Sequence, residues 1–392
     1  MLDGLRAVAL LSVFGYHFGL PVRPAMAFGG FGYRIIPNLD LGVEIFFVLS
    51  GFLIFRPFAA ANLSGMPLPR LQTYAIRRAL RIFPAYWVAL SVFLIAGEVR
   101  IQGGFWRYVA HYGLVQTYLP EDLRYVFDGI GPAWSLVVEV SFYILVPILA
   151  MVLRRASFDR HLAVIAALTL FGFVMRAITV AHPLNDKFGG WLRSSVGVLP
   201  FALAALGPGM ALAVLSVKPP RWATAVFRRV WVWWLGAVVC VVLLMVTAPT
   251  SVANPFRSAT SSAEFWHRMI TPIIAVALVG PCVLGDTDRS SLFRVLRQRW
   301  LVSIGVVSYG AYLWHHPLLL VSPGDHLHLS FLDLVGRSMW FVLLLAVGFL
   351  ALTLVLAAAS WLCVERPAQN LARRCVARLS DAQRAGRAGR AG

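Results

Sequence analysis

The sequence predicts an all-α integral membrane protein, a polytopic helical bundle of about ten transmembrane helices. Three observations support this prediction. Of the 392 residues, 59% are hydrophobic and only 13% are charged, whereas soluble domains average about a quarter charged. The mean hydropathy is +0.75. The apolar residues also form separate runs, each near the roughly 20 residues that cross a bilayer as a helix.

These apolar runs define the predicted spans in chain order. The stretch 105–119 is shorter and aromatic, so we expect it to lie at the membrane interface or to form a re-entrant segment. The predicted spans cover approximately residues 2–20, 39–58, 82–97, 133–153, 162–181, 196–217, 231–248, 269–285, 301–321 and 338–363.

The basic residues predict the orientation of the spans, because cytoplasmic loops have an excess of Lys and Arg. With both termini in the cytoplasm, 23 of the 35 Lys and Arg residues lie on the cytoplasmic side and ten on the opposite side. We therefore expect a multi-pass protein of the cell membrane with both termini cytoplasmic. The basic residues are spread over the gaps between apolar runs, so the net charge of +18 does not indicate a nucleic-acid partner.

The sequence predicts two regions, a membrane domain over residues 1–363 and a basic tail over residues 364–392. The tail is rich in Ala, Arg and Gly and ends in a short repeat. Such a composition is typical of disordered segments. We therefore expect a disordered cytoplasmic tail.

The first predicted helix is apolar except for three ionisable residues, Asp3, Arg6 and His17. Arg6 and His17 lie about 20° apart around a helix and about 16 Å apart along it, and Asp3 is within about 40° of the same stripe. Ionisable groups inside a membrane helix are costly and indicate a functional site. The alternative is a structural role, in which Asp3 and Arg6 suit a helix start and His17 packs in the core.

Several motifs make the chain resemble a known family. The residues Leu-Asp-Gly-Leu-Arg-Ala at positions 2–7, with His17 following Arg6, resemble the opening motif of the acyltransferase 3 family of integral-membrane O-acyltransferases. Further stretches agree with the family in order, at residues 42–54, 77–87, 134–139 and 308–317. The resemblance implies a membrane enzyme that transfers an acyl group.

Acyl transfer to a hydroxyl needs a base for the hydroxyl proton, a group that stabilises the developing oxyanion and a site for the donor. His17 suits the role of base, because imidazole titrates near neutral pH, and the resemblance implies the same role. Arg6 would position the donor or set the local potential. We predict His17, Arg6 and Glu139 as the catalytic residues.

Glu44 and Glu139 are the carboxylates deepest within apolar runs, so each needs a partner or a proton. Ser135 lies four residues before Glu139 and shares its helix face. Glu139 is expected to contact a His or Arg of another helix at the site. The alternative is a structural ion pair of Glu139 with Arg6 or Arg176.

Arg77, Arg78 and Arg81 lie at the cytoplasmic entrance of the third predicted span. The planar, always-charged guanidinium group suits the phosphates of coenzyme A. We therefore predict that these residues bind the donor, acyl-CoA. The alternative is that they only set the topology, since positive charge is expected on this side in any case.

Ser308, Tyr309, Tyr312 and His315 recur at a helical spacing in a late span. They are expected to line the path of the acceptor, or else to pack within the bundle. His316 does not indicate a metal site, because adjacent residues point apart on a helix and no second ligand follows at a helical spacing. The predicted substrate-binding residues are Asp3, Glu44, Ser135, Tyr309 and His315.

Taken together, these features predict transfer of an acyl group, most simply acetyl, from acyl-CoA to a hydroxyl of a glycan, glycolipid or glycosylated natural product. The bilayer, acyl-CoA and this acceptor are the expected partners. The alternative is a multi-span transporter of a small polar or anionic solute, because intramembrane charges also line permeation paths. Transporters often contain repeats in two halves, and the sequence shows none.

The predicted topology can be tested with reporter fusions. Fusions at positions 65, 157, 224, 293 and 380 should report a cytoplasmic location, because these segments have the excess of basic residues. Fusions near positions 187 and 258 should report the opposite side. A cytoplasmic signal at both 187 and 258 would contradict the arrangement of spans.

Overall fold

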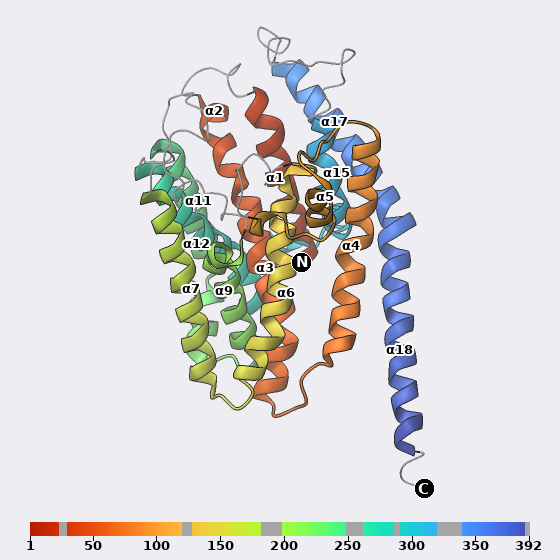
Figure 1. The fold of residues 1–392 in the computed structure, drawn as a ribbon. Coiled ribbons are helices and arrows are strands. Elements are labelled where there is room, and N and C mark those ends of the chain that lie inside the picture. Colours follow the sequence, from red (N-terminus) through yellow and green to blue (C-terminus); the bar gives the residue numbers. More distant parts are fainter. Residues whose placement is uncertain are drawn as a thin grey trace.

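The computed structural model of the chain describes residues 1–22, 30–119, 128–181, 198–247, 262–285, 291–319 and 339–388. Every regular element in these ranges is a helix, which confirms the all-α fold class. Figure 1 shows the long helices lying side by side in one bundle.

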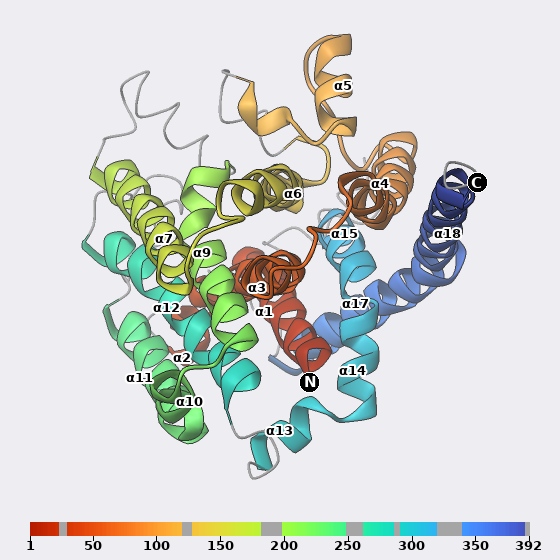
Figure 2. The ribbon, with the colours of Figure 1, turned by 90° about the horizontal axis from the view of Figure 1, so that it is seen from below.

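Helix α3 (Leu41–Leu63) lies in the middle of this bundle, next to α1 (Leu2–Val22). Figure 2 shows two groups of helices on either side of this pair, with α6 (Trp134–Val152) above it. One group contains α7 (Phe158–Ala181), α9 (Leu199–Val217), α10 (Arg221–Arg228), α11 (Val230–Thr247) and α12 (Ser262–Leu284). The other contains α4 (Leu71–Ile95), α14 (Arg299–Val306), α15 (Ser308–Leu319), α17 (Met339–Ser360) and α18 (Arg366–Ala388).

Short helices complete the described fold. Two of them, α2 and η2, lead directly into α3, and η5 leads into α6. The short elements are α2 (Phe31–Ile35), η2 (Ile36–Asp40), α5 (Phe105–Tyr112), η3 (Gln116–Tyr118), η5 (Gly131–Ala133) and α13 (Ser291–Leu296).

Glycines allow α3 and α9 to pack backbone against backbone. A Cβ atom on Gly51 would lie 2.2 Å from the carbonyl oxygen of Leu206, and one on Gly209 would lie 2.2 Å from that of Val48. Small residues are typical of close helix crossings in membranes, where dispersion contacts replace the hydrophobic effect. The position of α3 relative to α9 is therefore set by direct backbone contact.

Seven continuous helical stretches of the described residues are long and apolar enough to cross a membrane. The number becomes eight if α10 and α11, which are bent by 64° relative to each other, form one span. The predicted number of about ten is not confirmed. Helix α1 is long enough but contains Asp3, Arg6 and His17. The span predicted over residues 301–321 is interrupted at Val307, which separates the short helices α14 and α15.

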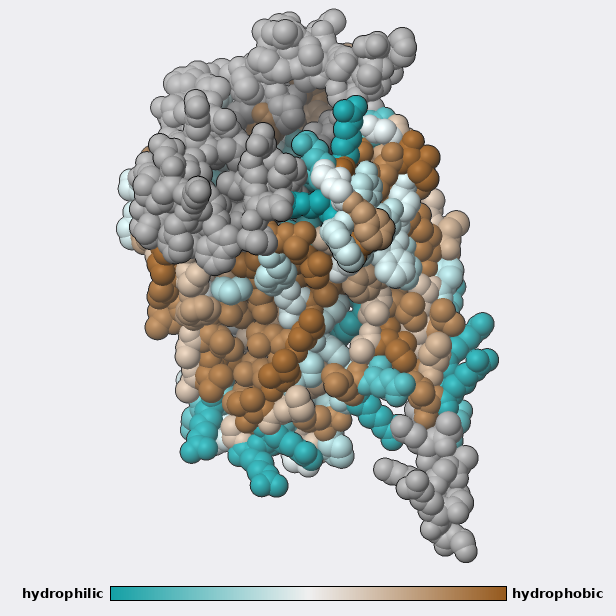
Figure 3. Space-filling model, viewed as in Figure 1, coloured by the Kyte–Doolittle hydropathy of each residue, from teal (hydrophilic) through white to brown (hydrophobic). Residues whose placement is uncertain are grey.

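The outer surface of the bundle agrees with a multi-pass membrane protein. Figure 3 shows a broad hydrophobic band with hydrophilic residues along its lower edge. Large apolar side chains on the outside include Ile144, Leu170, Val239 and Val355, with exposed fractions of 62%, 64%, 49% and 65%. Water would disfavour so much exposed apolar surface, whereas lipid accommodates it.

The structure contradicts the predicted disorder of the tail, because Arg366–Ala388 form helix α18. A π-helical turn, Trp361–Glu365, joins α17 directly to α18, so the helix continues across the predicted domain boundary. Ala and Arg are strong helix formers. Helix α18 packs against α4, and its residues Ala368 and Ala372 are buried. Residues 389–392 lie outside the described part.

Candidate active site

A polar cavity lies between α1, α3, α4, α6 and α15, and we call it the Glu139 cavity. It contains about 680 Å³ of empty space, its opening included. The residues that line it are Arg6, Val43, Phe46, Phe47, Leu49, Ser50, Arg81, Ile82, Ser135, Leu136, Glu139, Ser308, Tyr309 and Tyr312.

The charges of the Glu139 cavity come from three different helices. Arg6 on α1 and Arg81 on α4 are positive, and Glu139 on α6 is negative. Glu139 Oε1 accepts a hydrogen bond of 2.7 Å from the Tyr143 hydroxyl, whereas Arg6 lies 3.5 Å from Asp3, which does not line the cavity. The predicted ion pair of Glu139 with Arg6 is therefore not formed. The excess of positive charge suits an anionic group of a ligand.

Hydroxyl groups line another part of the same cavity. Ser135 Oγ and the Tyr312 hydroxyl lie 2.8 Å apart, and both are within hydrogen-bond distance of the Pro132 carbonyl oxygen. The Tyr309 hydroxyl donates a hydrogen bond of 2.7 Å to the carbonyl oxygen of Ile82. These bonds hold α15 against η5, α6 and α4. The predicted residues Ser135 and Tyr309 thus do line one cavity with Arg6, Arg81 and Glu139.

Three imidazole rings form a separate group, which we call the histidine cluster: His17, His315 and His316. His17 Nδ1 lies 3.2 Å from His315 Nε2, and the ring centroid of His17 lies 4.8 Å from that of His316. In the part of the chain that the structure describes, no three His, Cys, Asp or Glu side chains are placed to hold a metal ion.

The carbonyl partners of the two closest histidines assign their protons. His17 Nδ1 lies 3.0 Å from the carbonyl oxygen of Val13, and His315 Nδ1 lies 2.8 Å from that of Tyr312. A carbonyl oxygen only accepts, so each Nδ1 must bear the hydrogen. His315 Nε2 is then an acceptor for the His17 N–H. His17 Nε2 retains a lone pair and has no hydrogen-bond partner among the described residues.

Tyr312 connects the histidine cluster to the Glu139 cavity. Its side chain lines the cavity, and its carbonyl oxygen accepts the hydrogen bond from His315. Because α1 is one continuous helix, Arg6 in the cavity and His17 in the cluster are about 16 Å apart along its axis. A ligand that reaches both would therefore have to be long.

The structure separates the three arginines that the sequence groups together. Arg81 lines the Glu139 cavity. The Arg78 guanidinium lies over the rings of Tyr74 and Tyr143, at 5.6 and 5.4 Å from their centroids. Arg77 is exposed. Of the three, only Arg81 lies where it can touch a ligand in the cavity.

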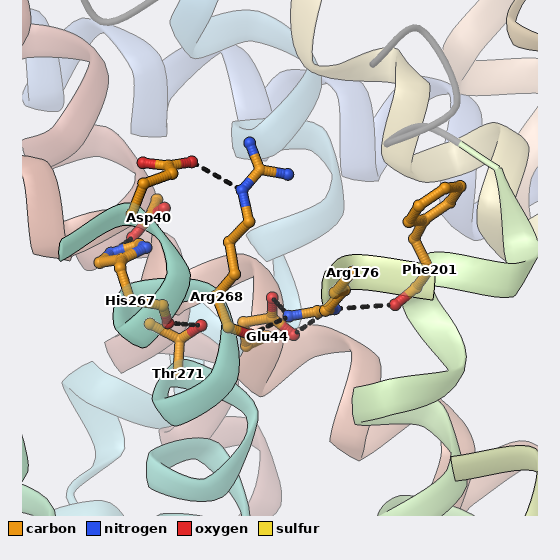
Figure 4. A network of polar contacts seen from close by, with 8 residues as sticks. Asp40, Glu44, Arg176, Phe201, His267, Arg268 and Thr271 are labelled. Carbon is orange, nitrogen blue, oxygen red and sulfur yellow. Dashed lines mark hydrogen bonds and ion pairs between the residues drawn. The ribbon is translucent and has the colours of Figure 1, made fainter. Parts of the chain in front are cut away.

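Glu44 lies in a second cavity, between η2, α3, α6, α7, α9 and α12, which we call the Glu44 cavity. It contains about 720 Å³ of empty space, its opening included. Both carboxylate oxygens of Glu44 contact Arg176, at 2.8 and 3.0 Å. Arg176 also donates to the carbonyl oxygens of Phe201 and Arg268, at 2.9 and 3.1 Å, as Figure 4 shows. The Glu44 ion pair thus joins α3, α7, α9 and α12.

Several residues were not predicted from the sequence as site residues: Arg176 and His316, and in the Glu44 cavity also Asp40, Glu264, His267 and Arg268. Arg176 is the only basic residue in the interior of its span, and this position predicts a need for an acidic partner. The spacing that identified Tyr309 and His315 also includes Tyr312. Nothing in the local sequence placed His316 beside His17, because this contact joins residues far apart in the chain.

Comparison with known proteins agrees with this architecture. A family model described as an acyltransferase domain, that of the acyltransferase 3 family, matches residues 1–361. The chain therefore belongs to the acyltransferase 3 family, a class of membrane acyltransferase enzymes.

Two curated relatives are similar along most of the chain. One is the peptidoglycan O-acetyltransferase OatA of Listeria monocytogenes, 26% identical, with 93% of this chain and 55% of the relative covered. The other is nodulation protein 10 of Rhizobium leguminosarum, also 26% identical, with 86% of this chain and 84% of the relative covered. The chain thus spans about half the length of the Listeria relative. No solved structure matches the chain.

The Glu44–Arg176 pair can be tested by its effect on stability. Arg176→Leu would leave a buried carboxylate without its partner, and such a change typically costs about 3–5 kcal/mol. We expect a clearly lower unfolding temperature in detergent. The double variant Glu44→Leu/Arg176→Leu removes both charges and should recover much of the lost stability. The control Arg160→Leu, at an exposed position of α7, should have little effect on the unfolding temperature. Equal losses in the single and double variants would show that the pair is not the cause.

Proposed function

We propose that this protein transfers an acyl group, most simply acetyl, from acyl-CoA to a hydroxyl of a glycan, glycolipid or glycosylated natural product. The observation on which the proposal mainly depends is His17, whose Nδ1 is held by Val13 and His315 and whose Nε2 is available as a base. Family membership supports acyl transfer over solute transport. The relative named as a peptidoglycan O-acetyltransferase supports acetyl as the acyl group and a cell-surface glycan as the acceptor.

In the proposed reaction, the acceptor oxygen attacks the thioester carbon while His17 Nε2 takes the hydroxyl proton. The C–S bond then breaks, and the proton passes to the departing thiolate, so that an ester and free coenzyme A result. His315 accepts the hydrogen bond from the other nitrogen of His17 and holds the ring in the required tautomer.

The donor would bind with its phosphates toward Arg81 and its acyl end toward His17. The positive excess of the Glu139 cavity, which Arg6 and Arg81 provide, favours an anionic group there. Glu139 limits this excess and is fixed by Tyr143. We further propose that Ser135 and Tyr309, which line the same cavity, contact the substrates.

We also propose that the membrane side from which the donor enters is the cytoplasm. The connections α3–α4, α6–α7 and α9–α10 and the end of α18 all lie at the lower end of the bundle in Figure 1. Basic residues gather at these points, including Arg70, Arg77, Arg154 and Arg221, which favours a cytoplasmic location. Arg81 lies on α4 on the way from this end into the bundle.

The role of His17 is tested by substitution in the purified protein. His17→Ala should lower the transfer rate by about 10²–10⁴, as expected for the loss of a general base. His17→Gln keeps a hydrogen-bonding side chain without a basic nitrogen and should be equally slow. Both variants should still bind acyl-CoA, measured by calorimetry. A turnover close to that of the wild type in either variant would refute the assignment.

The donor site is tested by comparing arginines on the same side of the bundle. Arg81→Ala should raise the KM for acyl-CoA about ten- to a hundredfold and leave the acceptor KM unchanged, because a charge-assisted hydrogen bond to phosphate is lost. Arg81→Lys should restore part of the affinity. Arg77→Ala should have a smaller effect, and the exposed Arg154→Ala none. If all four variants bind acyl-CoA equally well, the arginines serve only the topology.

A further inference from the structure

The Glu44 cavity is a built polar site that the proposed donor path does not use. It adjoins the Glu139 cavity, because Val43 and Phe47 of α3 line both. Arg176 lines the Glu44 cavity and has only 7% of its surface exposed. Its guanidinium group is held by Glu44 and by two backbone carbonyl oxygens. The Glu44–Arg176 part of the lining is therefore fixed before any ligand binds, which favours affinity.

Several polar groups of the cavity remain available to a ligand. Arg268 uses Nε to pair with Glu264, and its two terminal nitrogens make no hydrogen bond within the described residues; Figure 4 shows this guanidinium above the Glu44–Arg176 pair. The buried atoms Asp40 Oδ1 and His267 Nε2 face each other at 3.2 Å, the distance of an ion pair when the imidazole is protonated, but make no hydrogen bond of good geometry among the residues described, so a ligand would share this contact. Buried polar atoms of this kind usually have a partner. The cavity thus offers both donors and acceptors.

The remaining wall of the cavity is aromatic. Phe47, Trp134 and Phe201 line it, and the rings of Phe47 and Trp134 meet edge to face with centroids 6.2 Å apart. Pockets that combine aromatic walls with a few fixed polar groups are typical ligand sites. A sugar ring has a flat apolar face and hydroxyl groups around its edge. The apolar face suits the aromatic wall of the cavity, and the hydroxyl groups suit its polar side chains.

The charge balance of the lining argues against an anionic ligand. Three carboxylates, from Asp40, Glu44 and Glu264, face two guanidinium groups, those of Arg176 and Arg268. The lining therefore has a net charge of −1, or of zero if His267 is protonated, and in neither case a positive excess. A neutral ligand that both donates and accepts hydrogen bonds fits such a balanced site better than a phosphate or a carboxylate does.

We infer that the Glu44 cavity binds a neutral, hydroxyl-rich glycosyl unit through Arg268, Asp40 and His267 and against the Trp134 ring. That this unit belongs to the acyl acceptor rests on the proposed function. The position of the Glu44 cavity beside α1 supports this assignment to the acceptor. The carbonyl oxygen of Leu39, the neighbour of Asp40, accepts a hydrogen bond of 2.6 Å from Ser12 Oγ on α1. Ser12 lies five residues before His17, about 7.5 Å along α1 and about 140° around it, and Asp40 itself lies near enough to His17 for an electrostatic interaction.

The inference is tested by equilibrium binding, independently of turnover. The purified chain in lipid nanodiscs is titrated with methyl glycosides of glucose, N-acetylglucosamine and rhamnose, and with methyl glucuronide as the anionic probe, by saturation-transfer NMR. We expect at least one neutral glycoside to bind and the glucuronide to bind more weakly. Trp134→Leu and Arg268→Lys should each weaken the neutral glycoside about tenfold or more. Arg268→Lys keeps the charge beside Glu264, so its fold should be retained.

Two controls separate this result from other causes. Arg160→Lys, at an exposed position, should bind the glycoside like the wild type. His17→Ala should also retain glycoside binding, so a failure of the proposed catalytic role would leave this result unchanged. The inference is overturned if no neutral glycoside binds, if the glucuronide binds more tightly than the neutral glycosides, or if Trp134→Leu and Arg268→Lys bind like the wild type.

Discussion

The arrangement of this bundle depends on the pairing of charges that cannot remain alone in an apolar environment. Arg176 satisfies Glu44 on α3 and donates to backbone carbonyl oxygens on α9 and α12, so one guanidinium fixes four helices relative to one another. An unpaired carboxylate at this depth would cost several kcal/mol. The backbone contact between Gly51 of α3 and α9 allows this pairing, because it brings the two helices close enough for one side chain to bridge them.

Fixing α3 in this way also separates two polar cavities of opposite character. On one side of Val43 and Phe47, arginines outnumber carboxylates, and on the other side carboxylates outnumber arginines. In the reaction that we propose, these two environments would attract the anionic donor and the neutral hydroxyl-bearing acceptor to different sites.

Much of the first cavity could be predicted from the sequence, because its charged residues lie in helices that are otherwise apolar. Arg6 and Glu139 were identified in this way, and Ser135 by its spacing of four residues from Glu139, and all three line one cavity. Helical spacing gives the face on which a residue lies, but not the helix that this face meets, so the pairing of Glu44 with Arg176 could not be predicted. The helical tail was missed because its low complexity suggested disorder, although its residues favour a helix.

The distance along α1 bears on the donor that we propose for this protein. About 16 Å of helix separates Arg6, in the positively charged cavity, from His17, the residue with an available basic nitrogen. A short donor such as an acyl phosphate has its charge next to its reactive carbon and could occupy only one of these two positions. Acyl-CoA has its phosphates and its thioester at opposite ends of an extended arm, so it can contact both. The length of α1 between these two side chains is therefore compatible with the acyl-CoA donor that we propose.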